Sequence, residues 1–346
     1  MLLLNYKPVL DQPTGIGIYA NAVLPALQSF EHSLIPGGGS GGGKQRLKRL
    51  AWSQFQLPRL ARQQKANYIF TPAPEGYLGE QVVPQIVMVH DLRPLSHPER
   101  SMQSLYFRNW VPPLLSQCAH ILTNSSFTAS EIRQIPGIAE AKISVTPLGY
   151  DSSHFYPKNT KKTIHGRPYL LHIGQAYPHK NVYRLIQAFG IISKSFPQID
   201  LILAGKPHPT ETQRLTHLIS RMGISDRVIY KNYVPYKDLP DLYRGALCFI
   251  YPSLWEGFGL PIIEAMACGC PVITSHGSGM EEAARGSALL VDPLQTEQIS
   301  DAIRKILLSS QFRFQLRSAG LDRVNACDWE TCKKTTFDVL TQIMNA

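Results

Sequence analysis

The sequence predicts an α/β protein with two doubly wound domains, each a parallel β-sheet covered by helices. Short apolar runs rich in β-branched and aromatic residues alternate with longer segments of helical period, which is the pattern of βαβ units. The 346 residues also suit two domains of about 150 residues each. A polar, basic stretch without period, DSSHFYPKNTKKTIHGR at Asp151 to Arg167, interrupts the pattern and indicates a linker.

Nine apolar runs are predicted as strands, and most of the intervals between them have room for one helix. The runs are Asn67 to Phe70, Pro84 to Val89, His120 to Asn124, Ile143 to Pro147, Tyr169 to Ile173, Leu201 to Ala204, Arg227 to Tyr230, Cys248 to Tyr251 and Pro271 to Thr274. Ligands of parallel α/β sheets bind at the carboxyl ends of the strands. Functional residues are therefore expected in the loops after these runs.

The linker divides the chain into an N-terminal domain of residues 1–157 and a C-terminal domain of residues 158–328. The remaining segment, residues 329–346, has a helical pattern from Trp329 to Met344. This helix is expected to pack back across the domain junction.

Composition excludes several classes of protein. Hydrophobic residues make up 44% and charged residues 17% of the chain, which excludes disordered, collagenous and coiled-coil proteins. No apolar run approaches the roughly 20 residues of a membrane-spanning helix, and the first residues do not resemble a signal peptide. A soluble, cytoplasmic protein is expected. The six cysteines lack paired C-x-x-C spacing and are predicted to be free, buried thiols.

The formal net charge of +10 favours an anionic partner, which the charge leaves open as nucleic acid, an anionic membrane or a phosphorylated small molecule. The low-complexity run of residues 37–43 leads into a basic stretch, Lys44 to Lys65, with seven basic residues and no acidic one. A surface helix packed on the sheet is one interpretation. The other is contact with an anionic membrane, with Trp52 and Phe55 entering the headgroup region.

The strongest motif is PSLWEGFGLPIIEAMACGCPVITS, from Pro252 to Ser275. A strand ends before it, and Pro261 begins a helix, which places Glu256 on the loop and Glu264 inside the helix. The unpaired N–H groups at this helix N-terminus form an anion site that fits a diphosphate. The four residues that supply it are Gly257, Phe258, Gly259 and Leu260. A lone Gly-rich turn of this kind is more typical of a tight strand-to-helix connection, with Glu256 solvated and Glu264 balancing the helix dipole.

At these residues the sequence resembles the retaining glycosyltransferases of family 4 (group 1), whose GT-B fold has two Rossmann-like domains facing across a cleft. Glu256 and Glu264 reproduce the family's pair of glutamates eight positions apart. The resemblance continues through PTGIGIY, HDLRPL, TNSSFTASEI, VTPLG and SALLVDP, and so covers most of the chain. It implies that Glu256 holds donor-sugar hydroxyls and that Glu264 holds the nucleotide ribose.

Further contacts to the donor are expected from the second domain. GQAYPHKN, which opens with Gly174, follows the domain's first strand and brings Lys180 near the donor phosphates, where a cation stabilises the departing diphosphate. Many relatives carry an arginine directly after the glycine, whereas Gln175 and Ala176 stand here. KNYVP resembles the segment that lines the nucleotide base, with Val234 as its contact.

In the first domain, the TGIG sequence of residues 14–17 lies between a short strand and a helix expected to begin near Ile18. Gly15 and Gly17 allow close approach of backbone to the sugar or the acceptor. His90 ends an apolar strand, and the family's His-Asp pattern favours a contact with the donor sugar or the acceptor. Asp91 is expected to orient the loop rather than to act as a base.

No D-x-D sequence, the usual metal–diphosphate clamp of the other main glycosyltransferase architecture, occurs in the chain. The sequence therefore predicts metal-independent transfer without a cofactor, and the family resemblance implies that the transfer retains the donor's anomeric configuration. The predicted catalytic residues are Glu256, His90 and Lys180. The resemblance to bacterial mannosyltransferases of polysaccharide assembly favours GDP-mannose as donor before UDP-glucose, and a glycan or lipid-linked acceptor.

Three alternatives remain beside this interpretation. A sugar phosphorylase or a nucleotide-sugar epimerase would use the same two-domain arrangement. A nucleic-acid-binding protein would fit the charge, although the chain has no zinc-finger spacing and no RNA-binding aromatic signature, so no nucleic-acid partner is expected. A catalytically inactive scaffold would not need the two glutamates.

Overall fold

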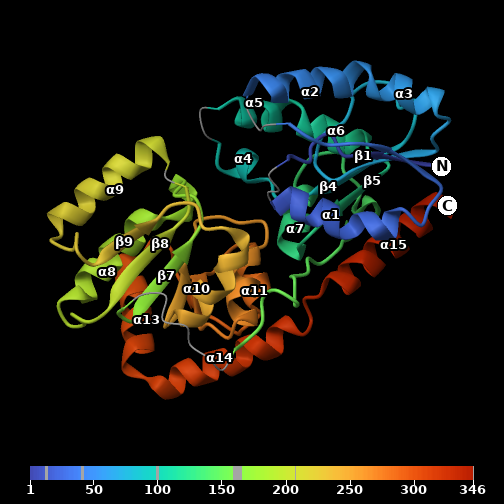
Figure 1. The fold of residues 1–346 in the computed structure, drawn as a ribbon. Helices are drawn as coiled ribbons and strands as arrows, with labels where there is room; N and C mark the ends of the chain where they lie inside the picture. Colours follow the sequence, from blue (N-terminus) through green and yellow to red (C-terminus); the bar gives the residue numbers. More distant parts are fainter. Residues whose placement is uncertain (12–14, 40–42, 99–100, 159–165, 207, 346) are drawn as a thin grey trace. The chain divides into compact units, whose positions relative to one another are not determined.

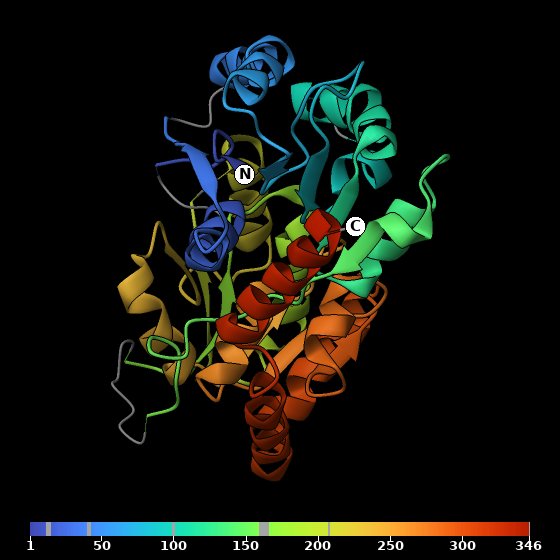
Figure 2. The ribbon, with the colours of Figure 1, turned by 90° about the vertical axis from the view of Figure 1, so that its right-hand side faces the viewer.

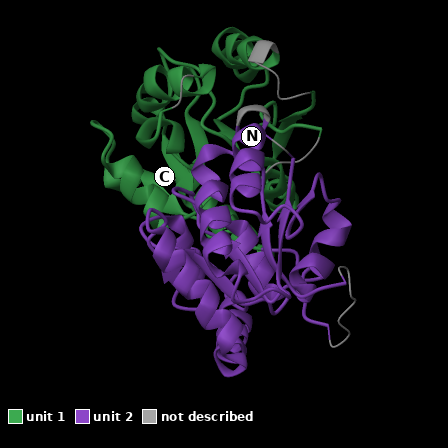
Figure 3. Cartoon of the chain, turned by 90° about the vertical axis from the view of Figure 1, so that its left-hand side faces the viewer, with its two compact units in different colours: residues 1–149, 329–346 green, residues 150–328 purple. Residues whose placement is uncertain are grey.

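The computed structural model describes residues 1–11, 15–39, 43–98, 101–158, 166–206 and 208–345. The chain forms two compact units (Figure 3), unit 1 with Met1–Gly149 and Trp329–Ala346, and unit 2 with Tyr150–Asp328. The division thus follows Gly149, whereas the sequence places it after residue 157. The C-terminal helix belongs to unit 1. Among the described residues, no helix is long and apolar enough to cross a membrane.

Unit 1 contains a parallel six-stranded sheet in the order β2-β1-β3-β4-β5-β6 (Figure 1). The strand order reverses beside β1, as in doubly wound folds. The bounds are β1 Leu2–Asn5, β2 His32–Ile35, β3 Tyr68–Thr71, β4 Gln85–Val89, β5 His120–Thr123 and β6 Ile143–Val145.

Helices cover the sheet of unit 1 and bury its strands. They are α1 Gly15–Leu27, α2 Gly43–Phe55, α3 Leu57–Gln63, α4 Arg93–Ser96, α5 Met102–Asn109, α6 Val111–Gln117, α7 Ser126–Arg133 and α15 Trp329–Asn345. Local sequence explains several helix starts. The side chain of Ser125 accepts a hydrogen bond from the Thr128 amide at the start of α7, and prolines occupy the first turns of α3 and α6. α15 packs along α1 (Figure 2).

Unit 2 repeats the architecture with the sheet order β12-β11-β10-β7-β8-β9, again all parallel. Its core lies between the sheet and α8, α9 and α13. The strands are β7 Tyr169–Ile173, β8 Asp200–Ala204, β9 Val228–Lys231, β10 Cys248–Tyr251, β11 Val272–Ser275 and β12 Leu289–Val291. The helices are α8 Val182–Ser193, α9 Pro209–Arg221, α10 Leu239–Gly245, α11 Leu260–Ala267, α12 Gly279–Ala284, α13 Thr296–Leu308 and α14 Ser310–Val324.

The predicted fold class is confirmed: each of the nine predicted runs overlaps one strand, and β1 is the short strand expected before the TGIG sequence. Two strands lack a counterpart among the predicted elements, β2 and β12, because each is a short edge strand whose burial is incomplete. α1 begins at Gly15 rather than near Ile18. The six cysteines are free and buried, as predicted.

Candidate active site

The candidate site lies where the strand order of unit 2 reverses, between β7 and β10. In doubly wound sheets, a crevice opens at this point beyond the carboxyl ends of the strands. The loop after β7 includes a short 3₁₀ turn, Pro178–Lys180, and the loop after β10 contains Glu256. The two loops that the sequence singles out therefore start from adjacent strands.

Lys180 and Glu256 form an ion pair at this point. Lys180 Nζ lies 2.6 Å from Glu256 Oε1, and the side chains of both residues are 16% exposed. Tyr251, the last residue of β10, joins them because its hydroxyl accepts a hydrogen bond from Lys180 Nζ at 2.5 Å and donates one to Glu256 Oε1 at 3.1 Å. Nζ also lies 4.9 Å from the centre of the Tyr251 ring. The cation is thus held by one carboxylate and one phenol.

Each member of the pair keeps its partner charged. Burial favours the neutral carboxyl of Glu256, but the charges of Lys180 and His179 and the hydrogen bonds to the carboxylate together outweigh burial and lower the carboxyl pKa. Burial likewise favours a neutral amine at Lys180, and Glu256 and Tyr251 together raise the pKa of that amine above its ordinary value. The site therefore presents a permanent cation beside a permanent carboxylate at neutral pH.

Asn181 fixes the position of Lys180. Its side-chain amide donates to the carbonyl oxygens of Pro252 at 3.0 Å and Pro293 at 2.7 Å. It is buried and adopts a left-handed backbone conformation with φ of 58°, which asparagine tolerates better than most residues. The amide thereby ties the Lys180 turn to the loops after β10 and β12.

His172, near the end of β7, forms the buried wall of the site. Its Nδ1 donates to the carbonyl oxygen of Ile250 at 2.9 Å, so Nε2 carries the lone pair. Nε2 is buried without a hydrogen-bond partner among the described residues. Burial lowers the imidazole pKa to about 4, and the ring is neutral at pH 7. A Cβ on Gly174 would lie 3.7 Å from this nitrogen.

The Gly-rich turn leads into α11 as the motif predicts, with Glu256 on the loop and Glu264 in the helix. Gly259, the residue before α11, has φ of 112°, a conformation that L side chains rarely adopt. The start of α12 packs closely on the turn, because a Cβ on Gly279 would lie 2.1 Å from the Gly257 carbonyl oxygen. Phe258 is buried beneath the turn and Leu260 begins α11.

Glu264 is half-buried on α11 and is bound by Tyr243, whose hydroxyl donates to Oε2 at 3.1 Å. Burial raises the carboxyl pKa to about 7, and the Tyr243 hydrogen bond only partly offsets that effect. Val234 lies beyond the end of β9 and is half-buried. Glu281 has a structural contact, since its carboxylate accepts a hydrogen bond from the Gly277 amide at 2.9 Å.

In unit 1, one residue of α1 contacts the histidine that directly follows β4. Gly15 and Gly17 belong to the first turn of α1, and Tyr19 of the same helix contacts His90 edge-on at 5.1 Å between ring centres. His90 Nε2 donates to the carbonyl oxygen of Pro72 at 3.1 Å, and burial lowers the imidazole pKa to about 4. Thr14 of the TGIG sequence lies outside the described residues.

Three residues of the unit 2 site were not predicted from the sequence: Tyr251, His172 and Tyr243. For Tyr251 and His172 a signal is present, because both lie in the last two positions of adjacent strands at the strand-order reversal. That signal requires the strand order, which a single sequence does not contain. Tyr243 lies on α10, and only its fold-dependent contact with Glu264 relates it to the motif.

Comparisons with known proteins identify the family of this chain. The family model "Glycosyltransferase Family 4" matches residues 18–154, and "Glycosyl transferases group 1" matches residues 157–323. The O-antigen chain mannosyltransferase B of Escherichia coli is 31% identical over 284 residues, covering 79% of this chain and 74% of the relative. The O-antigen chain mannosyltransferase RfbU of Salmonella typhimurium is 32% identical over 222 residues, covering 64% of this chain and 60% of the relative.

Solved structures show the same fold at low sequence identity. Sucrose-phosphate synthase from Thermosynechococcus elongatus has a TM-score of 0.80 at 20% identity, with 99% of each chain covered. The Anabaena protein Alr3699/HepE in complex with UDP-glucose has a TM-score of 0.78 at 18% identity, covering 99% of this chain and 100% of that one. The chain therefore belongs to glycosyltransferase family 4 (group 1), has the GT-B fold, and is a hexosyltransferase that takes its sugar from a nucleotide sugar.

Proposed function

We propose that this enzyme is a retaining, metal-independent mannosyltransferase that uses GDP-mannose and a hydroxyl of a glycan or lipid-linked acceptor. The observation that carries the proposal is the Lys180–Glu256 pair beside the Gly-rich start of α11. A cation and a helix N-terminus together suit a diphosphate leaving group. The names of the two O-antigen mannosyltransferase relatives favour mannose, and UDP-glucose is the second donor candidate.

In this proposal different residues of unit 2 bind the diphosphate, the sugar, the ribose and the base of the donor. Lys180 and the amides of Gly257 to Leu260 bind the diphosphate, with Gly174 leaving room beside Lys180. Glu256 binds hydroxyls of the sugar, Glu264 binds the ribose, and Val234 contacts the base. Charge develops at the sugar and on the diphosphate as their bond breaks, so contacts to those groups accelerate the reaction more than contacts to the ribose.

Retention is explained by attack on the face from which the diphosphate departs. The acceptor oxygen bonds to the anomeric carbon as the carbon–phosphate-oxygen bond breaks, and the leaving diphosphate accepts the acceptor's proton. Glu256 and Lys180 stabilise the two charges that separate. His90, supported by Gly15 and Gly17 of unit 1, is assigned to contacts with the sugar or the acceptor. Its neutral ring suits a hydrogen bond with a hydroxyl.

We expect transfer without a metal because of the residues proposed to bind the diphosphate. Because Lys180 and helix amides supply the positive charge, and no D-x-D sequence is present to hold a divalent ion, transfer is expected to survive an excess of EDTA. Loss of transfer with EDTA, and recovery with magnesium or manganese, would contradict this part of the proposal.

The donor is tested with a panel of GDP- and UDP-sugars, measuring slow hydrolysis and transfer to mannose-terminated oligosaccharides. GDP-mannose turnover that rises with an acceptor, and a product with the donor's anomeric configuration by NMR, are expected. If the enzyme consumed inorganic phosphate and released a sugar 1-phosphate from the oligosaccharide, it would instead be a phosphorylase. Inversion of a stereocentre of the donor's sugar without an acceptor would indicate an epimerase.

A further inference from the structure

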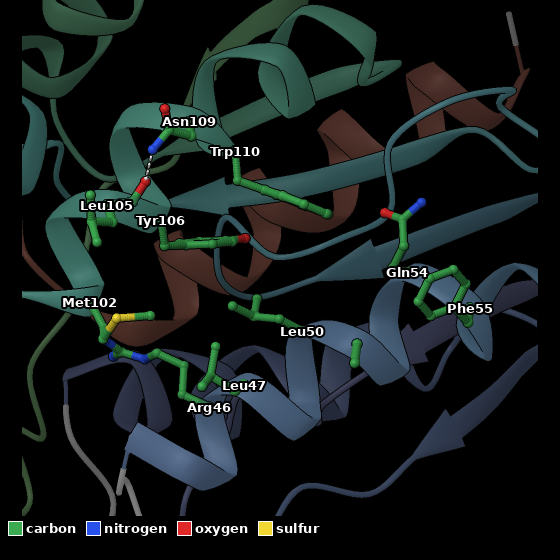
Figure 4. Close-up of a pocket in the computed structure, with 11 residues that line it drawn as sticks. Arg46, Leu47, Leu50, Gln54, Phe55, Met102, Leu105, Tyr106, Asn109 and Trp110 are labelled. Atoms are coloured by element: carbon green, nitrogen blue, oxygen red, sulfur yellow. Dashed lines mark hydrogen bonds between the residues drawn. The ribbon is translucent and has the colours of Figure 1, made fainter.

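An apolar groove lies on unit 1 between α2 and α5, with Trp110, the residue between α5 and α6, also in its lining (Figure 4). Its volume is about 380 Å³, and apolar atoms supply nearly all of its lining. Leu47 and Phe55 border it on α2, and Met102 and Leu105 border it on α5; each of these side chains is more than half exposed. Exposed apolar residues gathered in one hollow indicate a binding surface, whereas scattered ones do not.

The polar groups of the groove are mostly occupied within the protein. Gln54 exchanges two hydrogen bonds with the backbone of Leu78, Tyr106 donates to the Pro74 carbonyl oxygen at 2.7 Å, and Asn109 donates to that of Leu105 at 2.8 Å. Besides Arg46, the described lining retains one buried donor without a partner, Trp110 Nε1. A sugar or a peptide backbone needs many partners, so the lining suits hydrocarbon.

Cations border the groove, and none of the described residues that line it is acidic. Arg46 lines it, Lys48 on α2 and Arg108 on α5 are exposed, and α2 and α3 contain no acidic residue. Arg49 does not contribute, because its Nε and Nη2 each donate to the Glu75 carboxylate at 2.6 Å, which neutralises its charge. Apolar surface and unneutralised cations together are the two signals by which proteins bind anionic bilayers stably.

We propose that this groove receives lipid hydrocarbon from an anionic bilayer while the cations around it contact lipid phosphates. The occupant is a membrane lipid, and the proposal requires neither a particular donor nor a particular acceptor. It changes the membrane contact expected from the sequence. Trp52 packs against a core cluster with Lys7 Nζ 5.4 Å from its ring centre. Phe55, 62% exposed, and Trp110 are the aromatic residues at the lipid.

The first test measures co-sedimentation with vesicles of phosphatidylcholine alone and of a two-to-one mixture with phosphatidylglycerol. Binding to the anionic vesicles only is expected. Leu47→Gln with Leu105→Gln should weaken binding about tenfold or more, and Arg46→Gln with Lys48→Gln about tenfold. The matched controls, Leu308→Gln with Phe314→Gln and Lys194→Gln with Arg221→Gln, alter exposed residues of unit 2 and should bind as wild type.

The second test locates the hydrocarbon. Anionic vesicles with brominated acyl chains should quench the fluorescence of Trp110, and Trp110→Phe should remove that quenching while Trp255→Phe keeps it. Undiminished binding by the leucine variant, quenching unchanged by Trp110→Phe, or equal binding to neutral vesicles would overturn the proposal. A wild-type dimer that the leucine variant dissociates would assign the groove to a second copy and also overturn it. Donor hydrolysis should be unchanged in the groove variants, which separates this proposal from the proposed function.

Discussion

Lys180 and Glu256 depend on each other for their charges. Taking either side chain away leaves a mostly buried ion that has lost its counter-ion but keeps the hydroxyl of Tyr251 as a hydrogen-bond partner. Removing one partner of such a pair lowers the free energy of unfolding by more than the intact pair contributes to it. The reason is that the remaining ion has lost both water and its counter-ion. The pair also orients Lys180 before a donor binds, so the cation is placed without further ordering of its long side chain.

Glu256→Gln tests this arrangement. The amide keeps the shape of the side chain but removes the charge beside the reacting sugar, so we expect kcat to fall about 100-fold with little change in the KM of the nucleotide sugar. Tyr251→Phe keeps the ring and both charges of the ion pair. It is the control, and its kcat should fall far less than that of Glu256→Gln. Steady-state kinetics check this prediction, and a kcat near that of wild type for Glu256→Gln would refute the assigned role.

Glu264 gives the enzyme a pH dependence of donor binding. Its pKa of about 7 means that the carboxylate becomes protonated as the pH falls below 7, and a protonated carboxyl accepts ribose hydroxyls less well. We expect the Kd of an intact nucleotide sugar to rise, approaching tenfold per pH unit well below pH 7. The buried His172, with a pKa of about 4, stays neutral over this range.

Calorimetric titration between pH 5 and 8 measures this dependence, and Glu264→Gln is the matched variant. The amide cannot titrate, so its affinity should be lower at pH 8 and flat with pH. An intact nucleotide sugar is used because its diphosphate has no terminal phosphate that titrates near pH 6. The same pH slope in wild type and Glu264→Gln would assign the effect to another group.

At the scale of elements, the site depends on where backbone segments approach each other. Gly205, at the end of β8, has φ of 148°, and a Cβ there would lie 2.2 Å from the Gly174 carbonyl oxygen. Gly15, in the first turn of α1, has open space around its Cβ position. Packing therefore requires a glycine at position 205, whereas no contact within the described part of unit 1 requires one at position 15.

Gly15→Ala separates a binding role from a structural one. The added methyl meets nothing in the described structure, and alanine in a helix is stabilising by about 0.5–1 kcal/mol relative to glycine, so thermal unfolding should not occur earlier. If a substrate approaches this turn closely, kcat/KM should nevertheless fall. Gly205→Ala is the contrasting variant and should lower stability. Full activity in Gly15→Ala would remove this turn from the site.

The sequence predicts the central strands and the helices better than it predicts the edge strands of each sheet and the side-chain contacts that strand pairing creates. Central strands such as β4 and β10 are buried at every residue and are almost entirely apolar, because both faces are covered, which makes them visible as continuous runs. β2 and β12 are incompletely buried and short, so their pattern is weak. Glu256, Glu264 and Lys180 are visible through family motifs, whereas Tyr251 and His172 join the site only through the pairing of β7 with β10. The assigned roles of these residues remain predictions.

At the scale of the whole molecule, the two units differ in how the chain builds them. Unit 2 is one continuous segment, and it contains Lys180, Glu256 and Glu264. Unit 1 needs both ends of the chain, because α15 packs on α1, Phe337 stacks on Phe30 at 4.7 Å, and Tyr68 donates to the Ile343 carbonyl oxygen at 3.0 Å. Donor binding and the integrity of unit 1 should therefore be separable.

We expect a fragment of residues 150–328 to fold and to bind the nucleotide sugar with an affinity close to that of the whole chain, because the proposed phosphate, ribose and base contacts all lie within it. Transfer should be absent, since His90 and the glycines of α1 belong to unit 1. A fragment of residues 1–149 should be far less stable, because α1 loses the apolar face of α15. Circular dichroism melting and calorimetry check both fragments, with Lys180→Ala in the first as the control that should lose binding. A folded 150–328 fragment without affinity for the donor would mean that unit 1 supplies an essential part of the donor site.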